Sequence, residues 1–293
     1  MSDIFTGAGV AIITPMNNDG SVNYEKLGEL IENQINSGTD ALIICGTTGE
    51  SAALSGEEHM DCIKYAVRKV NKRIPVIAGT GSNDTAYAVE MSIDAEKAGV
   101  DGLLLVTPYY NKTSQKGLIA HFNAIADAVN IPIILYNVPS RTGCKIEIPT
   151  YKELAKHKNI AAVKEACGDI SFIAQIAADT DLTLYSGNDD QVVPIMALGG
   201  KGVISVASNI IPKEMHELTE YALRGDFKKA AELQLKYLSL MKALFCDVNP
   251  IPVKEAMNIM GMEVGKCRLP LISPDEDKIR LITNELKKFG LVK

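Results

Sequence analysis

The sequence lacks several features that mark particular classes of protein. Its six cysteines include no CxxC pair, which argues against a zinc site with the usual ligand spacing. A net charge of −6 leaves no basic footprint of the kind that indicates nucleic-acid binding. No apolar run reaches membrane-spanning length, and the start of the chain lacks the basic and apolar segments of a secretory signal. We therefore expect a cytoplasmic protein with reduced thiols.

Short apolar runs recur along the chain and alternate with longer segments that have the apolar spacing of helices. Eight runs of this kind occur, at Val10–Thr14, Ala41–Cys45, Pro75–Ala78, Gly102–Thr107, Pro132–Tyr136, Ala161–Lys164, Thr183–Ser186 and Gly202–Ala207. Eight strands that alternate with helices predict an α/β fold, specifically a (β/α)8 TIM barrel. The alternative is a doubly wound open sheet, but no GxGxxG motif follows the first run.

The segment after the eighth run contains more helix than one barrel layer needs. Helical patterns cover Lys213–Gly225, Phe227–Val248, Val253–Met260 and Asp275–Lys288. We therefore predict a catalytic barrel domain over residues 1–224 and an all-helical C-terminal domain over residues 225–293.

Lys164 occupies an unusual place for a lysine, because it ends an apolar run that reads as a buried strand. Burial disfavours the charged form and lowers the pKa of an amine, and the neutral amine can form a Schiff base with a ketone. The alternative is a lysine that reaches the surface and pairs with Glu165. Lys201 lies at the N-terminal end of a strand, and Lys112 and Lys145 lie in loops. Lys164 is therefore the only lysine that we expect to point into the barrel mouth.

Other polar residues stand at the ends of the predicted strands, where TIM barrels carry their chemistry. The turn Gly46-Thr47-Thr48-Gly49-Glu50 could hold a carboxylate with backbone N–H groups and hydroxyls. Tyr136 could transfer protons beside Lys164, and Arg141 could bind a second carboxylate. Each also has a structural alternative: a plain tight turn, a half-buried tyrosine and a solvated arginine. No histidine stands at these ends, so we expect no histidine-rich metal site.

Three motifs together resemble those of the dihydrodipicolinate synthase family. They are Gly46-Thr-Thr-Gly-Glu50, Tyr136-Asn-Val-Pro139 followed by Arg141-Thr-Gly143, and Val163-Lys-Glu165. That family belongs to the pyruvate-dependent class I aldolases, which include N-acetylneuraminate lyase. The resemblance extends from Gly7–Pro15 to Asn249–Lys254 and so covers nearly the whole chain.

The resemblance implies a specific reaction. Pyruvate would form a Schiff base with Lys164, and its enamine would attack L-aspartate 4-semialdehyde to give 4-hydroxy-tetrahydrodipicolinate, the first committed intermediate of diaminopimelate and lysine biosynthesis. Residues matching Thr47, Tyr110 and Tyr136 form a proton relay in the family, with Tyr136 as the proton donor. The imine supplies the electron sink, so the family needs no metal and no organic cofactor.

The resemblance also assigns the remaining substrate contacts. It implies that Thr48 and Ile204 contact pyruvate, that Gly187 belongs to the substrate-binding set, and that Arg141 binds the carboxylate of the semialdehyde. In the family, the tyrosine at the position of Tyr110 reaches across a subunit contact into the neighbouring active site. The resemblance therefore implies a homo-oligomer, with a dimer as the smallest complete unit and a tetramer as a common form.

The chain departs from the family at the site through which lysine inhibits some members. Inhibited bacterial enzymes carry a histidine at the position of Gly56 and a glutamate at the position of Tyr87. We therefore expect feedback by L-lysine to be weak or absent.

Three rival functions are compatible with parts of the pattern. A sister aldolase that cleaves N-acetylneuraminate or a keto-deoxy sugar acid would share the pyruvate half of the site. A non-catalytic barrel that binds a keto acid would not need the relay residues. A phosphate-binding barrel would use the turn Ser186-Gly187-Asn188-Asp189, whose adjacent acids Asp189 and Asp190 disfavour an anion.

Overall fold

A computed structural model describes residues 3–293, and its centre is a closed barrel of eight parallel strands. Each strand pairs with the next along the chain, and β8 pairs back with β1. The strands are β1 (Gly7–Ala11), β2 (Ala41–Ile44), β3 (Val76–Gly79), β4 (Gly102–Val106), β5 (Ile133–Asn137), β6 (Ile160–Glu165), β7 (Thr183–Ser186) and β8 (Gly202–Ser205). The predicted TIM barrel is confirmed, and the open doubly wound sheet is excluded because the barrel has no edge strand.

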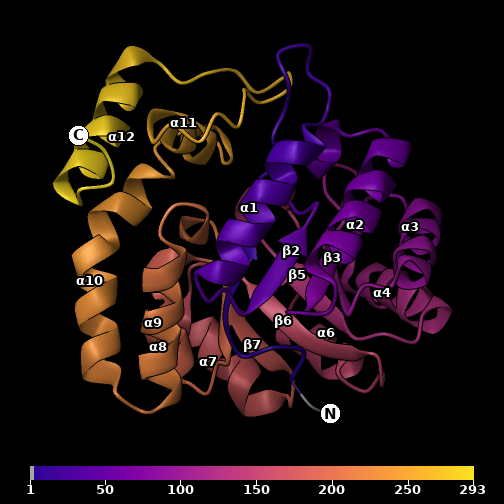
Figure 1. Cartoon of the computed structure of the whole chain (residues 1–293). Helices are drawn as coiled ribbons and strands as arrows, with labels where there is room; N and C mark the ends of the chain where they lie inside the picture. The colour runs from indigo at the N-terminus through magenta and orange to yellow at the C-terminus, as the bar shows by residue number, and fades with distance from the viewer. Residues whose placement is uncertain (1–2) are drawn as a thin grey trace.

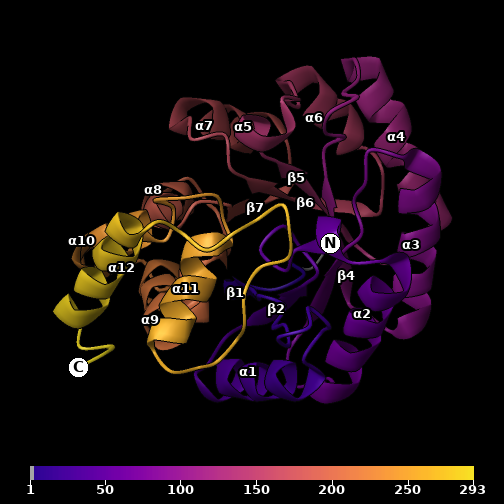
Figure 2. The ribbon, with the colours of Figure 1, turned by 90° about the horizontal axis from the view of Figure 1, so that it is seen from above.

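Helices connect the strands and surround them as an outer ring (Figures 1 and 2). They are α1 (Tyr24–Asn36), α2 (Gly56–Val70), α3 (Thr85–Ala98), α4 (Gln115–Ala128), α5 (Pro139–Thr142), α6 (Ile148–Leu154), α7 (Ile170–Asp179), α8 (Val192–Ala197) and α9 (Pro212–Leu223). Three short 3-10 helices lie in the loops after β2, β7 and β8, at η1 (Ser51–Ala53), η2 (Asp189–Gln191) and η3 (Ala207–Asn209).

The first strand lies closer to the N-terminus than the apolar run Val10–Thr14 predicts. Its ladder to β8 begins with Gly7 opposite Gly202, where a Cβ on Gly202 would come 1.9 Å from the Gly7 carbonyl oxygen. Ile12 and Ile13 are as buried as the strand residues, although they follow the end of β1. A pattern of apolar residues indicates which residues are buried, but not which residues form backbone hydrogen bonds to a neighbouring strand. The pattern therefore cannot show where a strand ends.

The barrel interior is closed at its N-terminal end by two aromatic rings. Phe5, which precedes β1, stacks on Tyr185 of β7 with ring centroids 4.3 Å apart. The Tyr185 hydroxyl also donates a hydrogen bond of 2.7 Å to the Phe5 carbonyl. Side chains therefore fill this end of the barrel. The polar residues of a TIM-barrel site lie at the opposite end, where the strands finish.

Three helices after the barrel form a C-terminal extension, drawn orange to yellow in Figure 1: α10 (Phe227–Ala243), α11 (Ile251–Ile259) and α12 (Glu276–Lys288). α10 packs against α8 and α9, and α12 packs against α10 and α11. The predicted helix Phe227–Val248 is too long, because α10 ends at Ala243 and turns follow. Phe245 and Val248 continue the apolar spacing while about half exposed, so the spacing there does not reflect a buried helical face. Across residues 3–293, no helix combines the length and apolar character that a membrane crossing requires.

Candidate active site

Lys164 points into the barrel near the end of β6. Its register partners are Tyr136 of β5 and Tyr185 of β7, and both tyrosines belong to the cluster that fills the barrel. Register partners on neighbouring parallel strands face the same side of the sheet, so Lys164 faces inward with them. Only 5% of the Lys164 surface is exposed. The lysine predicted from its place in the sequence therefore lies inside the mouth.

The neighbouring acid, Glu165, faces the other side of the sheet. Its carboxylate accepts hydrogen bonds from the Asn137 side chain at 2.9 and 3.0 Å and from the Tyr151 hydroxyl at 2.9 Å. The Cys167 N–H donates a further bond of 2.9 Å to it. The alternative in which Lys164 pairs with Glu165 at the surface is therefore wrong, since alternation along a strand sends adjacent side chains to opposite faces.

Burial lowers the pKa of Lys164 to about 8, and the positive charge of Arg141 acts in the same direction. The negative charge of Asp189 opposes both effects and raises that pKa. At a pKa of about 8, roughly a tenth of the amine is neutral at pH 7, compared with about one part in a few thousand for an ordinary lysine. The site thus holds a lysine that can act as a nucleophile near neutral pH.

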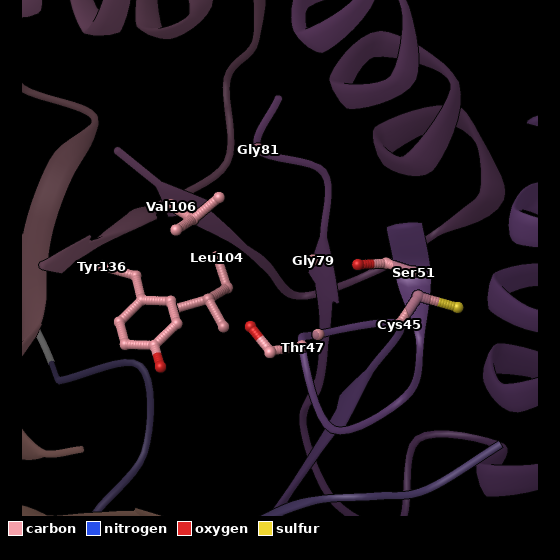
Figure 3. Close-up of a pocket in the computed structure, with 9 residues that line it drawn as sticks. Cys45, Thr47, Ser51, Gly79, Gly81, Leu104, Val106 and Tyr136 are labelled. Atoms are coloured by element: carbon pink, nitrogen blue, oxygen red, sulfur yellow. The ribbon is translucent and has the colours of Figure 1, made fainter. Parts of the chain in front are cut away.

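Tyr136 lies directly beside the lysine, with its ring centroid 4.3 Å from the Lys164 Nζ atom. Burial raises the pKa of the tyrosine to about 12, while Arg141 and the Thr47 hydroxyl act to lower it. The phenol therefore keeps its proton at neutral pH and can donate it. Figure 3 shows the side chains of Tyr136 and Thr47 near each other at one small pocket, which Leu104 and Val106 of β4 also line.

The turn after β2 brings the backbone close to this pocket. A Cβ on Gly79 of β3 would lie 2.4 Å from the Cys45 carbonyl oxygen, so only a glycine allows the turn to pack there. Within the turn, the Glu50 N–H donates to the Thr47 carbonyl at 3.1 Å. The Thr48 hydroxyl accepts a bond of 2.9 Å from the Asn249 side chain, and Thr48 is buried. The two threonines are therefore held in place by different contacts.

A larger cavity of about 370 Å³ adjoins the pocket and is lined by Thr47, Tyr109, Arg141 and Asn249, among others. Arg141 belongs to α5, and its guanidinium donates to the Asn249 carbonyl at 3.4 Å. The cavity can therefore present a cation to a substrate beside the lysine.

The remaining predicted residues differ in their placement. Ile204 of β8 is buried in the barrel interior, and Gly187 directly follows β7. A Cβ on Gly187 would lie 2.8 Å from the Ala166 Cβ, so the position requires a small residue. Tyr110 is different, because it is 90% exposed and does not join the pocket. Its backbone is left-handed with φ of 69°, which is uncommon for a non-glycine residue.

The structure also brings to the mouth residues that the sequence did not indicate as site residues. Asp189 is buried and accepts hydrogen bonds from the backbone N–H groups of Val206 and Ala207 at 3.1 and 2.9 Å. Asn249 and Lys254 arrive from the C-terminal extension. Lys254 stands out in the sequence as a lysine among the apolar positions of α11, whereas nothing local in the chain marks the side chain of Asn249 as a partner of Thr48.

Comparison with known proteins agrees with this geometry. A model of the dihydrodipicolinate synthetase family matches residues 4–289. A 4-hydroxy-tetrahydrodipicolinate synthase of Acetivibrio thermocellus is 59% identical over 291 residues, which cover 99% of each chain. The solved dihydrodipicolinate synthase of Aquifex aeolicus is 46% identical with a TM-score of 0.96, over 98% of this chain and 99% of that one. The enzyme of Acinetobacter baumannii, solved with pyruvate, is 44% identical with a TM-score of 0.96, over 98% of this chain and 99% of that one. The chain therefore belongs to the dihydrodipicolinate synthetase family.

Proposed function

We propose that this enzyme condenses pyruvate with L-aspartate 4-semialdehyde to form 4-hydroxy-tetrahydrodipicolinate, the first committed step of diaminopimelate and lysine biosynthesis. The observation that carries the proposal is the buried Lys164, whose pKa of about 8 supplies neutral amine at the barrel mouth. Relatives named 4-hydroxy-tetrahydrodipicolinate synthase match 99% of this chain. The pyruvate in the structure of the Acinetobacter baumannii enzyme supports the first substrate.

The chemistry begins with the neutral amine of Lys164. The nitrogen attacks the ketone carbon of pyruvate, and loss of water from the carbinolamine leaves a protonated imine. Loss of a methyl proton then gives an enamine, whose carbon attacks the aldehyde of the semialdehyde. The imine nitrogen accepts the electron pair when the methyl proton leaves and returns it when the enamine attacks, so the reaction needs no metal and no organic cofactor. The amino group of the semialdehyde part then attacks the imine carbon, which closes the ring and releases the amine of Lys164.

Tyr136 is the proton donor of this scheme. Its hydroxyl keeps its proton near neutral pH, and its ring contacts the lysine that forms the imine. Thr47 lines the same pocket as Tyr136. In this proposal it passes protons between Tyr136 and the Tyr110 of a neighbouring chain, which completes the relay. The relay moves the proton that the carbinolamine hydroxyl needs in order to leave as water.

The remaining residues bind the two substrates. Thr48, Ile204 and Gly187 contact the pyruvate part, and Arg141 binds the carboxylate of the semialdehyde. The position of Arg141 on the larger cavity, next to the pocket of Tyr136, supports this division. A guanidinium suits the task because its fork can hold both oxygens of a carboxylate.

A second copy of the chain completes the site in this proposal. Tyr110 is almost fully exposed in one chain, in a backbone conformation that few tyrosines adopt, and such a side chain is available to a neighbour. We propose a homo-oligomer, at least a dimer and in its full form a tetramer, that works in the cytoplasm. We also propose that residues 1–224 are its catalytic domain and residues 225–293 its helical domain. Native mass spectrometry tests the assembly directly.

The decisive assay measures condensation of pyruvate with L-aspartate 4-semialdehyde, beside cleavage of N-acetylneuraminate and of a keto-deoxy sugar acid. The proposal expects turnover in the first reaction and little in the others. Cleavage of a sugar acid at the higher rate would instead identify a sister aldolase. A protein that binds pyruvate without any turnover would be a keto-acid-binding barrel.

A further inference from the structure

A buried ion pair joins the turn after β2 to the C-terminal extension. The Lys254 Nζ atom of α11 lies 2.9 Å from the Glu50 Oε1 atom, and the two residues are 1% and 4% exposed. The transfer of two charged groups from water to the protein interior is unfavourable. The attraction between them offsets this desolvation only when their geometry is good and further hydrogen bonds satisfy both groups. Such a pair is therefore a costly way to add stability alone.

Both partners have further hydrogen bonds that recover this cost. Lys254 also donates to the carbonyls of Thr14 and Lys266, at 3.1 and 2.8 Å. The second oxygen of Glu50 accepts from the Arg268 N–H at 2.8 Å. The pair thus ties three segments together: the chain after β1, the turn after β2 and the extension.

The Glu50 side chain anchors the turn that carries Thr47 and Thr48. Glu50 has a left-handed backbone with φ of 55°, a conformation that needs support in a residue other than glycine. Its N–H closes the turn on the Thr47 carbonyl, and the hydroxyl of Thr14 donates to the Gly49 carbonyl at 2.7 Å. Thr14 is therefore bonded both to the turn and to Lys254.

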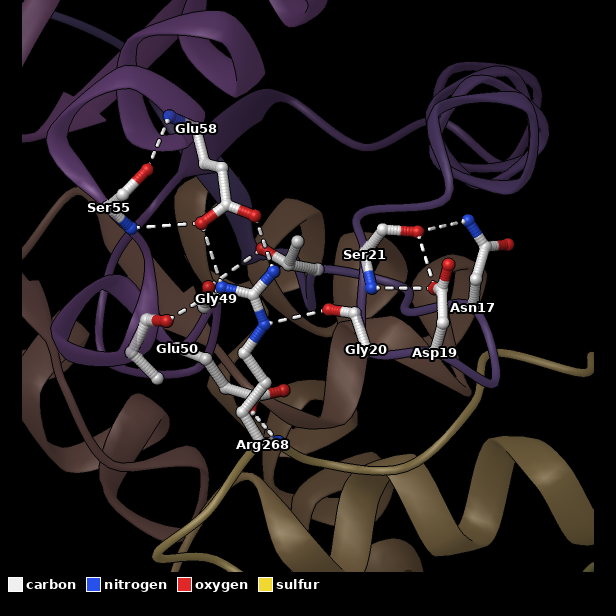
Figure 4. A network of polar contacts seen from close by, with 11 residues as sticks. Asn17, Asp19, Gly20, Ser21, Gly49, Glu50, Ser55, Glu58 and Arg268 are labelled. Atoms are coloured by element: carbon white, nitrogen blue, oxygen red, sulfur yellow. Dashed lines mark hydrogen bonds and ion pairs between the residues drawn. The ribbon is translucent and has the colours of Figure 1, made fainter.

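Arg268 of the extension holds the far side of the same loop. Figure 4 shows its guanidinium between the Glu58 carboxylate and the Gly20 carbonyl. It also donates to the Ala53 carbonyl of η1 at 2.8 Å. The loop is thus attached to the extension at Glu50 and again at η1.

We propose that Glu50 and Lys254 are positioning residues that hold Thr47 and Thr48 at the barrel mouth, so that the C-terminal extension helps to assemble the active site. This inference rests on the proposed function. In the proposed reaction, neither Glu50 nor Lys254 touches the reacting atoms. Both act only through the positions of the two threonines of the turn. A displacement of about 1 Å in a catalytic group can lower a rate about 100-fold, so the anchor of the turn affects turnover.

The test compares Glu50→Gln, Lys254→Met and the double variant, with Lys288→Met as control. Lys288 belongs to α12 and donates to Ser239 of α10 at 2.7 Å, so its contact stays within the extension. Borohydride trapping of pyruvate on Lys164 gives the concentration of adduct-forming sites. Turnover is then expressed per such site, which removes any unfolded fraction from the comparison.

Each single variant should lower kcat per adduct-forming site about tenfold or more and raise the KM for pyruvate. The KM for the semialdehyde should change less than about twofold, and Lys288→Met should match the original enzyme. Because the two residues act as a unit, the double variant should lose no more than the more damaged single variant, rather than the product of both losses.

Glu50→Gln keeps the size of the side chain, so it decides the matter if Lys254→Met fails to fold. A melting temperature that falls while kcat per adduct-forming site stays unchanged would overturn the positioning role. Losses that multiply in the double variant would overturn the coupled action of the pair. Failure of the proposed function would look different, because the unmodified enzyme would then show no condensation at all.

Discussion

The Lys164 Nζ atom lies 4.3 Å from the centroid of the Tyr136 ring, and the two residues are register partners on adjacent strands. The strand ladder itself therefore sets the distance between the proposed nucleophile and the proposed proton donor. Because both side chains are buried, the pKa of the lysine falls to about 8 and that of the tyrosine rises to about 12. Burial thus favours the neutral form of each group, which is the form that the proposed reaction uses.

Lys164→Arg should abolish turnover while the protein stays folded. A guanidinium keeps the positive charge but remains protonated, so it cannot form an imine. Mass spectrometry after treatment with pyruvate and borohydride should find the adduct on the Lys164 peptide of the original enzyme and none in the variant. Lys201→Arg, at the opposite end of the barrel, serves as the control and should keep full activity. An adduct on another lysine would refute the assignment.

The rate should follow the titration of Lys164. Since its folded pKa is lowered to about 8, the reactive amine increases as pH rises through 8 and is nearly complete above about 9. We expect kcat/KM for pyruvate to rise with pH below 8 and to level off above it. Tyr136, with a pKa of about 12, should cause no decline in this range. A rise that continues to about pH 10 would show that the lysine has an ordinary pKa.

Tyr136→Phe should lower kcat about 10²–10⁴-fold, the usual effect of removing one proton-transfer group. The variant keeps the ring that contacts Lys164, so the fold should survive. Tyr185→Phe is the matched control, since that hydroxyl bonds the Phe5 carbonyl at the closed end of the barrel. It should lower the melting temperature and leave kcat within about twofold. Unchanged kcat in Tyr136→Phe would make Tyr136 a structural residue.

Two inactive variants should restore activity to each other if Tyr110 serves a neighbouring site. Hybrids of Tyr110→Phe and Lys164→Ala can place an intact Tyr110 beside an intact Lys164 of the other chain. We expect partial activity after mixing and reassembly, and none from either variant reassembled alone. Native mass spectrometry must verify the hybrids. Verified hybrids without activity would place Tyr110 in the site of its own chain.

Inhibition by L-lysine should be weak or absent. The Tyr87 hydroxyl lies 3.4 Å from the place of a Cβ on Gly56, so the two departures from inhibited enzymes are neighbours in space. A tyrosine offers no negative charge to lysine, and loss of a charge-assisted hydrogen bond costs about 1.5–3 kcal/mol, roughly tenfold or more in affinity.

A dose–response curve measures this inhibition, and Tyr87→Glu is the informative variant because it restores the carboxylate. That change should increase sensitivity to lysine about tenfold. Half-inhibition of the unmodified enzyme below about 1 mM would contradict the prediction. It would mean a binding free energy for lysine of about −4 kcal/mol or better, which would require another group to bind the amine.

The sequence by itself determined the fold and indicated Lys164 as the proposed nucleophile. Alternating strand and helix patterns leave few arrangements other than a barrel, and a lysine that ends a buried strand in such a barrel lies near its mouth. The motifs around Thr47, Tyr136 and Lys164 were equally readable, because each is local in the chain.

Only the tertiary structure decided the ends of β1 and α10, the outward direction of Glu165, and the contacts of Asp189, Asn249 and Lys254 with the mouth. Ladder ends depend on partners in other strands, and apolar spacing cannot distinguish a buried turn from a strand. The ion pair of Lys254 with Glu50 joins residues 204 positions apart. Contacts of this kind arise from packing, since no local pattern in the chain encodes which distant residues will meet.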